Sequence, residues 1–157
     1  MLSIPLRELD ALRKLRDSGV QYLIVGGHAV RHYGVERTTE DLDVFVSRAP
    51  ENALRLYAAI VNILGRLPDF DWAVLAEPNK HINFGSGEPN LDVLTAMPGL
   101  EFNRAYADRT MAVQDGLSIP VLAKADLIAT KKEVASRDAR RRERELKDIE
   151  LLAAGTA

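Results

Sequence analysis

Cysteine is absent from this chain of 157 residues. A disulfide, a thiol nucleophile and a cysteine-ligated zinc site are therefore excluded. Long apolar runs are also lacking, because the longest, Leu56 to Leu64, is interrupted by Asn62 and is far shorter than the ~20 residues of a membrane-spanning helix. The N-terminus MLSIPLRELD has no basic region followed by an apolar segment, so we expect no secretory signal and a cytoplasmic protein.

A strong charge of one sign is the next feature that the sequence lacks. The net charge is −2, which argues against binding of nucleic acid through the overall field of the protein. The segment from Lys131 to Lys147 is an exception, because it is rich in Lys and Arg and contains RRRER at Arg140 to Arg144. Such a run on a helix is either a solvated face or a surface for phosphates.

The composition is that of an ordinary globular protein, with 46% apolar and 28% charged residues. We expect a single domain over residues 1–157, with an α/β core over 1–122 and C-terminal helices over 123–157. Apolar spacing and turn residues predict helices over 5–18, 28–33, 50–65, 123–136 and 140–153. Strands are predicted over 22–25, 41–47, 70–75, 81–84, 91–97, 109–114 and 117–122. This order predicts an α/β (α+β) fold with a small mixed β-sheet flanked by helices.

Two turn and edge features follow from the same pattern. Asp115-Gly116 predicts a tight hairpin between the last two strands. The strand over 117–122 has few charges, and could leave a sheet edge open for pairing with another chain.

Two aspartates, Asp41 and Asp43, stand at the start of an otherwise apolar strand. Residues two apart on a strand project to the same face, so their carboxylates should lie side by side and repel each other. A solvated edge would explain them, but so would Mg²⁺, which prefers carboxylates, water and substrate phosphates. Asp92, the only polar residue of LDVL, is a third candidate. Three acids on adjacent strands could hold two metal ions for phosphoryl or nucleotidyl transfer.

Gly26 and Gly27 lie where a strand hands over to a short helix. Glycine at this position lets backbone N–H groups approach a phosphate, although a pair of glycines is by itself only a tight turn. The order of strand, glycine pair, short helix, polar loop and Asp-x-Asp strand is much more specific than either motif alone.

These segments resemble the DNA polymerase β-like nucleotidyltransferase superfamily, in its minimal stand-alone branch, which includes AbiEii-type toxins. The matching stretches are IVGGHAVRHYG, RTTEDLDVFV, LDVLTAM, IPVLAKADLIATKK and LKDIELL, which together span nearly the whole chain. The resemblance implies a nucleotidyltransferase fold and a site in which the glycine turn holds the triphosphate and Asp41, Asp43 and Asp92 are catalytic and bind Mg²⁺. Many relatives carry serine at the second turn position, where this chain has Gly27.

Further candidates lie around these motifs. Arg37 could bind a phosphate with its planar guanidinium or be a surface residue, and Thr38 could bind phosphate or cap the loop. His28 is close enough to the glycine turn to touch a nucleotide or to be structural, and His81 has no second histidine at ligand spacing. The resemblance adds Lys131 as a nucleotide-binding candidate and Asp148 as a tentative site residue.

The sequence therefore favours a Mg²⁺-dependent enzyme, with two ions expected, that transfers a nucleoside monophosphate from an NTP to a hydroxyl and releases pyrophosphate. The acceptor stays open: an RNA, especially tRNA, or a protein, as in toxin–antitoxin components, or a small antibiotic of the aminoglycoside or lincosamide type. A non-catalytic toxin–antitoxin partner with the same fold is the alternative from another class. The three carboxylates argue against it, because a lapsed site has no reason to keep their repulsion.

Overall fold

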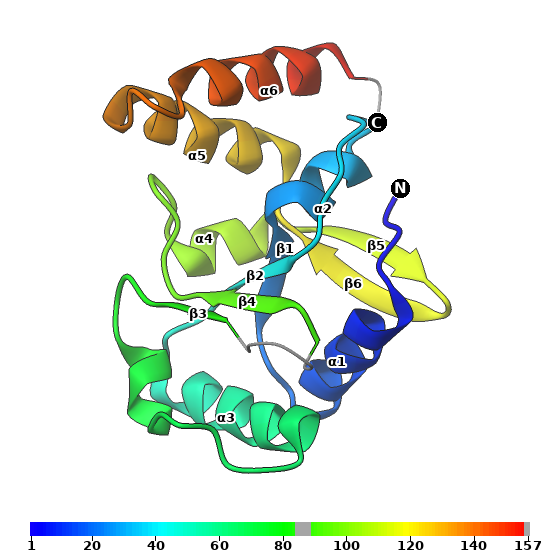
Figure 1. The fold of residues 1–157 in the computed structure, drawn as a ribbon, viewed down its shortest axis with the longest axis vertical. Helices are drawn as coiled ribbons and strands as arrows, with labels where there is room; N and C mark the ends of the chain where they lie inside the picture. The colour runs from blue at the N-terminus through cyan, green and yellow to red at the C-terminus, as the bar shows by residue number, and fades with distance from the viewer. Residues whose placement is uncertain (84–88, 156–157) are drawn as a thin grey trace.

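The structure is a computed structural model, and it describes residues 1–83 and 89–155. A six-stranded mixed sheet with the order β3-β4-β2-β1-β6-β5 forms its centre (Figure 1). The strands are β1 (Tyr22–Val25), β2 (Leu42–Val46), β3 (His81–Asn83), β4 (Leu91–Leu94), β5 (Thr110–Gln114) and β6 (Leu117–Val121). β2 runs parallel to β4 and β1 runs parallel to β6, whereas the β1–β2, β3–β4 and β5–β6 pairs are antiparallel.

Helices lie on the sheet and beyond one end of it (Figure 1). They are α1 (Leu6–Asp17), α2 (Gly26–His32), α3 (Pro50–Leu64), the 3-10 helix η1 (Trp72–Ala76), α4 (Phe102–Ala107), α5 (Lys124–Arg137) and α6 (Arg142–Ala154). α1 packs against α3, and the C-terminal helices α5 and α6 form an antiparallel pair that contains the chain's basic segment. Among residues 1–83 and 89–155 no helix is long and apolar enough to cross a membrane.

Local sequence signals explain where α1 and α3 begin and end. In α1 Leu9, Leu12 and Leu15 are buried, as their spacing predicts for one face of a helix. α3 begins with Pro50 in its first turn and ends at Leu64, and it is followed by Gly65, whose φ of +71° favours glycine. The central strands β1 and β2 are almost wholly buried, which makes the sheet the core of the molecule.

The hairpin predicted at Asp115-Gly116 is confirmed, whereas the strand predicted over 70–75 is wrong. Asp115 and Gly116 both have positive φ, 50° and 78°, as a two-residue turn of this type requires. The expected strand over 70–75 is instead η1, preceded by Asp71, because this short apolar run buries only Leu75 fully. Helix α4 was not anticipated, although the Glu101 side chain caps it by accepting from two backbone N–H groups.

The strand over 117–122 is not an edge. It corresponds to β6, which lies between β1 and β5, so that β3 and β5 are the edges of the sheet. The strand expected over 91–97 ends at Leu94, and that over 81–84 ends at Asn83, with position 84 outside the described residues.

Candidate active site

Two of the three predicted carboxylates lie on neighbouring strands at the same level. Asp43 of β2 is the register partner of Asp92 of β4, and the strands are parallel. Asp92 is buried and Asp43 is half-buried. Asp41 differs, because it is exposed and precedes Leu42, the first residue of β2. The sheet thus places two carboxylates side by side, and a third, that of Asp41, lies just before the start of β2.

The carboxylate pair is electrostatically unfavourable on its own. Burial raises the pKa of Asp43 to about 7, and the adjacent Asp92, through hydrogen bonding and charge, and the charge of Asp41 act in the same direction. Like charges in a half-buried place favour a shared proton or a bound cation. Near neutral pH Asp43 is therefore close to the point at which it loses its proton.

Strand β3 contributes two side chains that the sequence reasoning did not place in the site. Asn83 is the register partner of Asp92, and its amide nitrogen donates a hydrogen bond to Asp92 Oδ1. His81 Nε2 lies 3.5 Å from Asp92 Oδ2. The alternation in His-Ile-Asn puts His81 and Asn83 on one face, but only the pairing of β3 with β4 reveals that this face meets Asp92.

Glycine is required at position 26 because the backbone there lies very close to the Asp43 side chain. Its φ is +66°, and a Cβ at this position would lie 2.1 Å from Asp43 Oδ2. Val25, the preceding residue, is the register partner of Asp43, which explains why the turn lies against this carboxylate. Any side chain at position 26 would be strained and would displace Asp43.

Gly27 is required by a different neighbour. A Cβ there would lie 2.7 Å from Thr39 Oγ1, in the loop that precedes β2. The serine found in many resembling proteins would therefore collide with this loop. The side chain of Thr39 fills the space that a serine at position 27 would need.

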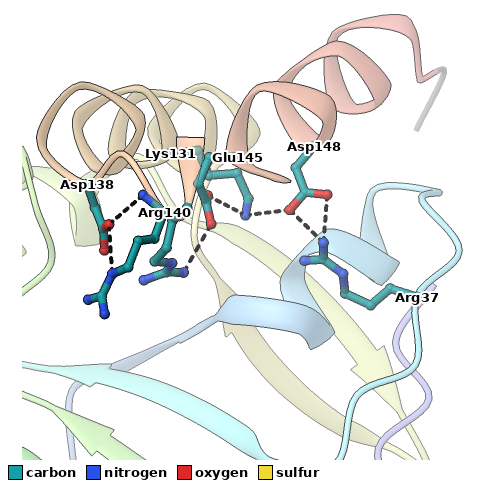
Figure 2. A network of polar contacts seen from close by, with 7 residues as sticks. Arg37, Lys131, Asp138, Arg140, Glu145 and Asp148 are labelled. Atoms are coloured by element: carbon teal, nitrogen blue, oxygen red, sulfur yellow. Dashed lines mark hydrogen bonds and ion pairs between the residues drawn. The ribbon is translucent and has the colours of Figure 1, made fainter. Parts of the chain in front are cut away.

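A network of ion pairs joins the C-terminal helices to the loop before β2 (Figure 2). Lys131 of α5 donates to Glu145 Oε2 at 3.1 Å and to Asp148 Oδ2 at 2.9 Å, both on α6. Arg37 Nη2 lies 2.6 Å from both oxygens of Asp148, and Arg141 Nη2 lies 3.0 Å from Glu145 Oε1. The carboxylates of Glu145 and Asp148 are buried, and each is paired with two cations, which offsets the cost of burying its charge.

Asp148 is held in its charged form by this network. Burial on its own would raise the pKa of Asp148, but the hydrogen bonds from Arg37 and Lys131 and their charges outweigh it and lower the pKa. Asp148 therefore stays negative and fixes both cations. Arg37, predicted as a phosphate ligand or surface residue, is partly buried and ion-paired.

One cavity of about 370 Å³ is lined by half of the predicted site residues. Gly26, Asp41, Asp43, Asp92 and Lys131 line it, as do three ionisable residues that were not predicted for the site: His81, Arg141 and Glu145. Five other candidates do not line it: Gly27, His28, Arg37, Thr38 and Asp148.

Among these five, His28 and Thr38 differ in exposure. His28 is buried in the first turn of α2, and its pKa is lowered by burial and by Arg31. Thr38 is exposed in the loop before β2. Lys132 is exposed while its neighbour Lys131 is buried, as expected for adjacent residues of a helix.

The donor set fits Mg²⁺ held together with a substrate. In residues 1–83 and 89–155 no three His, Asp or Glu side chains are arranged to hold a metal ion by themselves. Mg²⁺ does not require such a cage, because it is usually bound by one or two carboxylates, water and substrate phosphates. Asp43 and Asp92, paired across two strands with Asp41 close by, offer the oxygens that this mode needs.

Comparison with known proteins identifies the fold. No family model matches the sequence, and neither does any curated protein. Among solved structures, an antigenic nucleotidyltransferase-like protein from Paracoccidioides brasiliensis superimposes with a TM-score of 0.54 at 14% sequence identity, over 94% of this chain and 73% of that one. The mixed sheet with its flanking helices and C-terminal helix pair is thus a nucleotidyltransferase-like fold, as predicted.

Proposed function

We propose that this protein is a Mg²⁺-dependent nucleotidyltransferase that transfers a nucleoside monophosphate from an NTP to a hydroxyl group and releases pyrophosphate. The observation that carries the proposal is the pairing of Asp43 with Asp92 in a cavity beside the glycine turn. Two carboxylates kept this close are costly without a cation, and the fold is one that nucleotidyltransferase-like proteins share.

The residues that line the cavity are proposed to have different roles. Asp41, Asp43 and Asp92 would hold Mg²⁺, of which we propose two ions, and the metal would neutralise charge that develops at the α-phosphate. Asp92 would also accept the proton of the acceptor hydroxyl, oriented for this by its hydrogen bond from Asn83. Lys131 and Arg141, which also line the cavity, would supply positive charge toward the triphosphate.

The glycine turn is proposed to bind the pyrophosphate leaving group through Gly26 and Gly27. The finer assignments are proposals as well: an acceptor that is RNA (tRNA) or protein, membership of the AbiEii-like branch, and a role as a cytoplasmic toxin–antitoxin component. The ion pair of Arg37 with Asp148 supports an indirect role for Arg37, since it ties the loop before β2 to α6.

The proposal is tested by transfer of label. Each of the four α-labelled NTPs is incubated with Mg²⁺, the protein and a cell extract, which is then resolved into RNA, protein and small molecules. We expect one labelled fraction that disappears with Asp43→Asn and persists with Asp10→Asn, an exposed acid of α1. Label that survives in Asp43→Asn would contradict the proposed site. Absence of both transfer and NTP binding in the unmodified protein would favour a non-catalytic binding partner.

A further inference from the structure

The outer edge of β5 is open. β5 has five residues, Thr110–Gln114, whereas β3, at the other edge of the sheet, has three. In the part of the chain that the structure describes, β5 pairs with β6 alone, and it lies on the side of the sheet away from β3 (Figure 1). Sheet edges are often protected by lysine, proline or a bulge, but TMAVQ contains neither residue and its register with β6 is unbroken. β5 is therefore free to pair with another strand.

The direction of the backbone groups of β5 follows from its hairpin with β6. Asp115-Gly116 is a two-residue turn, so Gln114, which precedes it, forms a hydrogen-bonded pair with its register partner on β6. Hydrogen-bonded and non-hydrogen-bonded pairs alternate along an antiparallel ladder, so Ala112 also directs its N–H and C=O toward β6. The N–H and C=O of Met111 and Val113 consequently point away from β6 and are available to a partner strand.

The two faces of β5 differ in their surroundings. Ala112 is buried, and the Gln114 side chain accepts from Ile4 N at 2.9 Å and donates to Ile4 O at 2.8 Å, so this face packs on the N-terminal segment. Met111 and Val113 project to the other face and are 51% and 68% exposed. A partner strand would thus cover apolar side chains as well as backbone groups.

Opposite charges flank this apolar centre. Arg109 precedes β5 and Asp115 follows it, and both are exposed. The Arg109 guanidinium donates to Tyr106 O at 2.8 Å and lies 4.1 Å from the centre of the Tyr106 ring, which holds it in place. Among the described residues, neither Arg109 nor the Asp115 carboxylate has an ion-pair partner. Both charges are therefore available to a second molecule.

The segment from Arg109 to Asp115 is complementary to an antiparallel copy of itself. When Ala112 lies opposite Ala112 of the second copy, Met111 lies opposite Val113, and these are the residues whose backbone groups point outward. In the same register Arg109 lies opposite Asp115 at both ends, because a two-fold axis repeats each contact. A shift by two residues in either direction leaves both charges without an opposite partner.

We propose that β5 pairs antiparallel with β5 of a second copy of this chain, and that the resulting dimer has one continuous sheet with its two-fold axis at Ala112. Met111 and Val113 supply the backbone hydrogen bonds and the apolar contact, and Arg109 and Asp115 select the register. The carboxylate pair of β2 and β4 is separated from β5 by β1 and β6, so each copy keeps its whole cavity. The dimer is therefore independent of the proposed function.

Sedimentation velocity on the unmodified chain, at up to about 1 mM protein, tests whether the dimer forms. The mass should rise with concentration from 17.4 kDa toward twice that value. Arg109→Glu puts like charges opposite each other at both ends of the paired strands, and should raise the dissociation constant by about tenfold. Arg144→Glu, at an exposed position of α6, makes the same change in charge and should leave the dimer unchanged.

Asp115→Asn separates the ion pair from the turn. Asparagine tolerates the positive φ of this position, so the hairpin should be kept. In the unmodified chain this substitution removes the partner of Arg109 and should weaken the dimer, whereas in the Arg109→Glu variant it removes a like charge and should strengthen the dimer. Such a reversal requires the two positions to meet across the interface, because a structural effect of Asp115 alone would have the same sign in both backgrounds.

Single cysteines, which the chain otherwise lacks, test the register. Ala112→Cys places two thiols opposite each other at the axis, in a non-hydrogen-bonded pair with Cα atoms ~4.5 Å apart, within reach of a disulfide. Met111→Cys places the thiols diagonally, with Cα atoms ~7–8 Å apart, beyond the usual reach of a disulfide. Mild oxidation should therefore give a covalent dimer of Ala112→Cys and not of Met111→Cys, although Met111 is more exposed than Ala112.

Three results would overturn the proposal. The first is an unmodified chain that stays monomeric at about 1 mM. The second is a dimer that Arg109→Glu, shown to be folded by circular dichroism, leaves intact, and the third is covalent linkage of Met111→Cys as readily as of Ala112→Cys. A dimer with the expected responses in a protein that transfers no label would support this interface and refute only the catalytic proposal.

Discussion

Asp43 and Asp92 occupy the same register position on the parallel strands β2 and β4, and the turn at Gly26 lies directly against Asp43. Neighbouring strands of a sheet are ~4.8 Å apart, so two side chains on the same face at this level necessarily interact. Asp92 is buried and Asp43 is half-buried, so water screens their repulsion only weakly. The stability of the protein should therefore report directly on the charge of this pair.

The first prediction concerns pH. Folding raises the pKa of Asp43 from the ~3.9 of an unfolded aspartate to about 7, so the folded state binds more protons between these values. The contribution of Asp43 to stability is thus fully present below about pH 4 and is lost as pH rises through about 7, by at most ~1.4 kcal/mol per pH unit. In the absence of Mg²⁺, Asp43→Asn should have a flatter pH profile and should be more stable than the unmodified protein at alkaline pH.

Urea unfolding at a series of pH values, with chelator present, checks this expectation. Asp10→Asn serves as the control, because Asp10 is exposed on α1. Adding Mg²⁺ above neutral pH should raise the midpoint of the unmodified protein more than that of Asp43→Asn, since binding to the folded state alone stabilises it. Parallel pH profiles for the unmodified protein and Asp43→Asn would show that the carboxylate pair is not electrostatically coupled as described.

The second prediction concerns the glycine turn. Gly27→Ser would place a Cβ 2.7 Å from Thr39 Oγ1 and should cost about 1–3 kcal/mol of unfolding free energy, as overpacking commonly does. Because Gly27 is not in a left-handed conformation, the cost should come from this contact and not from the backbone. Thr39→Gly should consequently recover much of the loss.

A double-mutant cycle of Gly27→Ser and Thr39→Gly measures the coupling by chemical denaturation. A coupling of about 1 kcal/mol or more is expected for residues in direct contact. Additive effects of the two substitutions would mean that the loop before β2 moves away from the turn at little cost.

Sequence reasoning was sufficient for features that depend on local pattern. The glycine pair, the apolar strands and the helix spacing predicted most elements, and the Asp-x-Asp motif pointed to Asp43. The sequence could indicate that the strand with Asp92 lies next to the strand with Asp43. The positions of His81 and Asn83 beside Asp92, by contrast, depend on the register of β3 with β4. Register is set by the whole sheet and its turns, so it has no signature in three residues.

The C-terminal half shows the same limit more clearly. Lys131 and Asp148 were selected by resemblance, yet Glu145, which pairs with Lys131, and Arg141, which pairs with Glu145, lie in a stretch of alternating charge that is typical of a solvated helix face. Burial of Glu145 and Asp148 follows only from the packing of α5 against α6. A run of charges in the sequence does not reveal which of its members will be buried.

The third prediction concerns the ion pair of Arg37 with Asp148. Asp148→Ala would leave Arg37 and Lys131 without their shared partner, and removing one partner of a buried pair costs ~3 kcal/mol or more. Asp138→Ala is the control, because Asp138 pairs with Arg140, which is 93% exposed, and also accepts from the Arg140 backbone N–H, so its loss should cost only about 1 kcal/mol. Equal losses of unfolding free energy in the two variants would contradict the buried network.

The pH dependence of this pair has the opposite sign to that of Asp43. The pKa of Asp148 is lowered on folding, so its stabilising contribution is present above the unfolded pKa of ~3.9 and is lost as pH falls through the folded value. The stability difference between the unmodified protein and Asp148→Ala should therefore shrink in acid. Denaturation curves at neutral and at strongly acidic pH compare the two.

The fourth prediction separates a structural from a nucleotide-binding role for Lys131. Its ammonium has three donors, of which Glu145 and Asp148 take two, and the side chain lines the cavity, so one donor is left for a phosphate. Lys131→Met should therefore lose both stability and affinity for NTP, the latter by about tenfold, equivalent to ~1.4 kcal/mol for one charge-assisted hydrogen bond. Lys132→Met, one residue along and exposed, should lose neither.

Calorimetric titration with a non-hydrolysable NTP analogue and Mg²⁺, performed at a temperature where every variant is folded, measures this affinity without the confounding loss of stability. If Lys131→Met is destabilised but binds the analogue as the unmodified protein does, Lys131 serves only to hold Glu145 and Asp148 in place. If its affinity falls while that of Lys132→Met does not, the same ammonium joins the helix pair to the triphosphate. Binding of substrate and packing of α5 on α6 would then depend on one side chain, so nucleotide should also slow the exchange of backbone amides in α6.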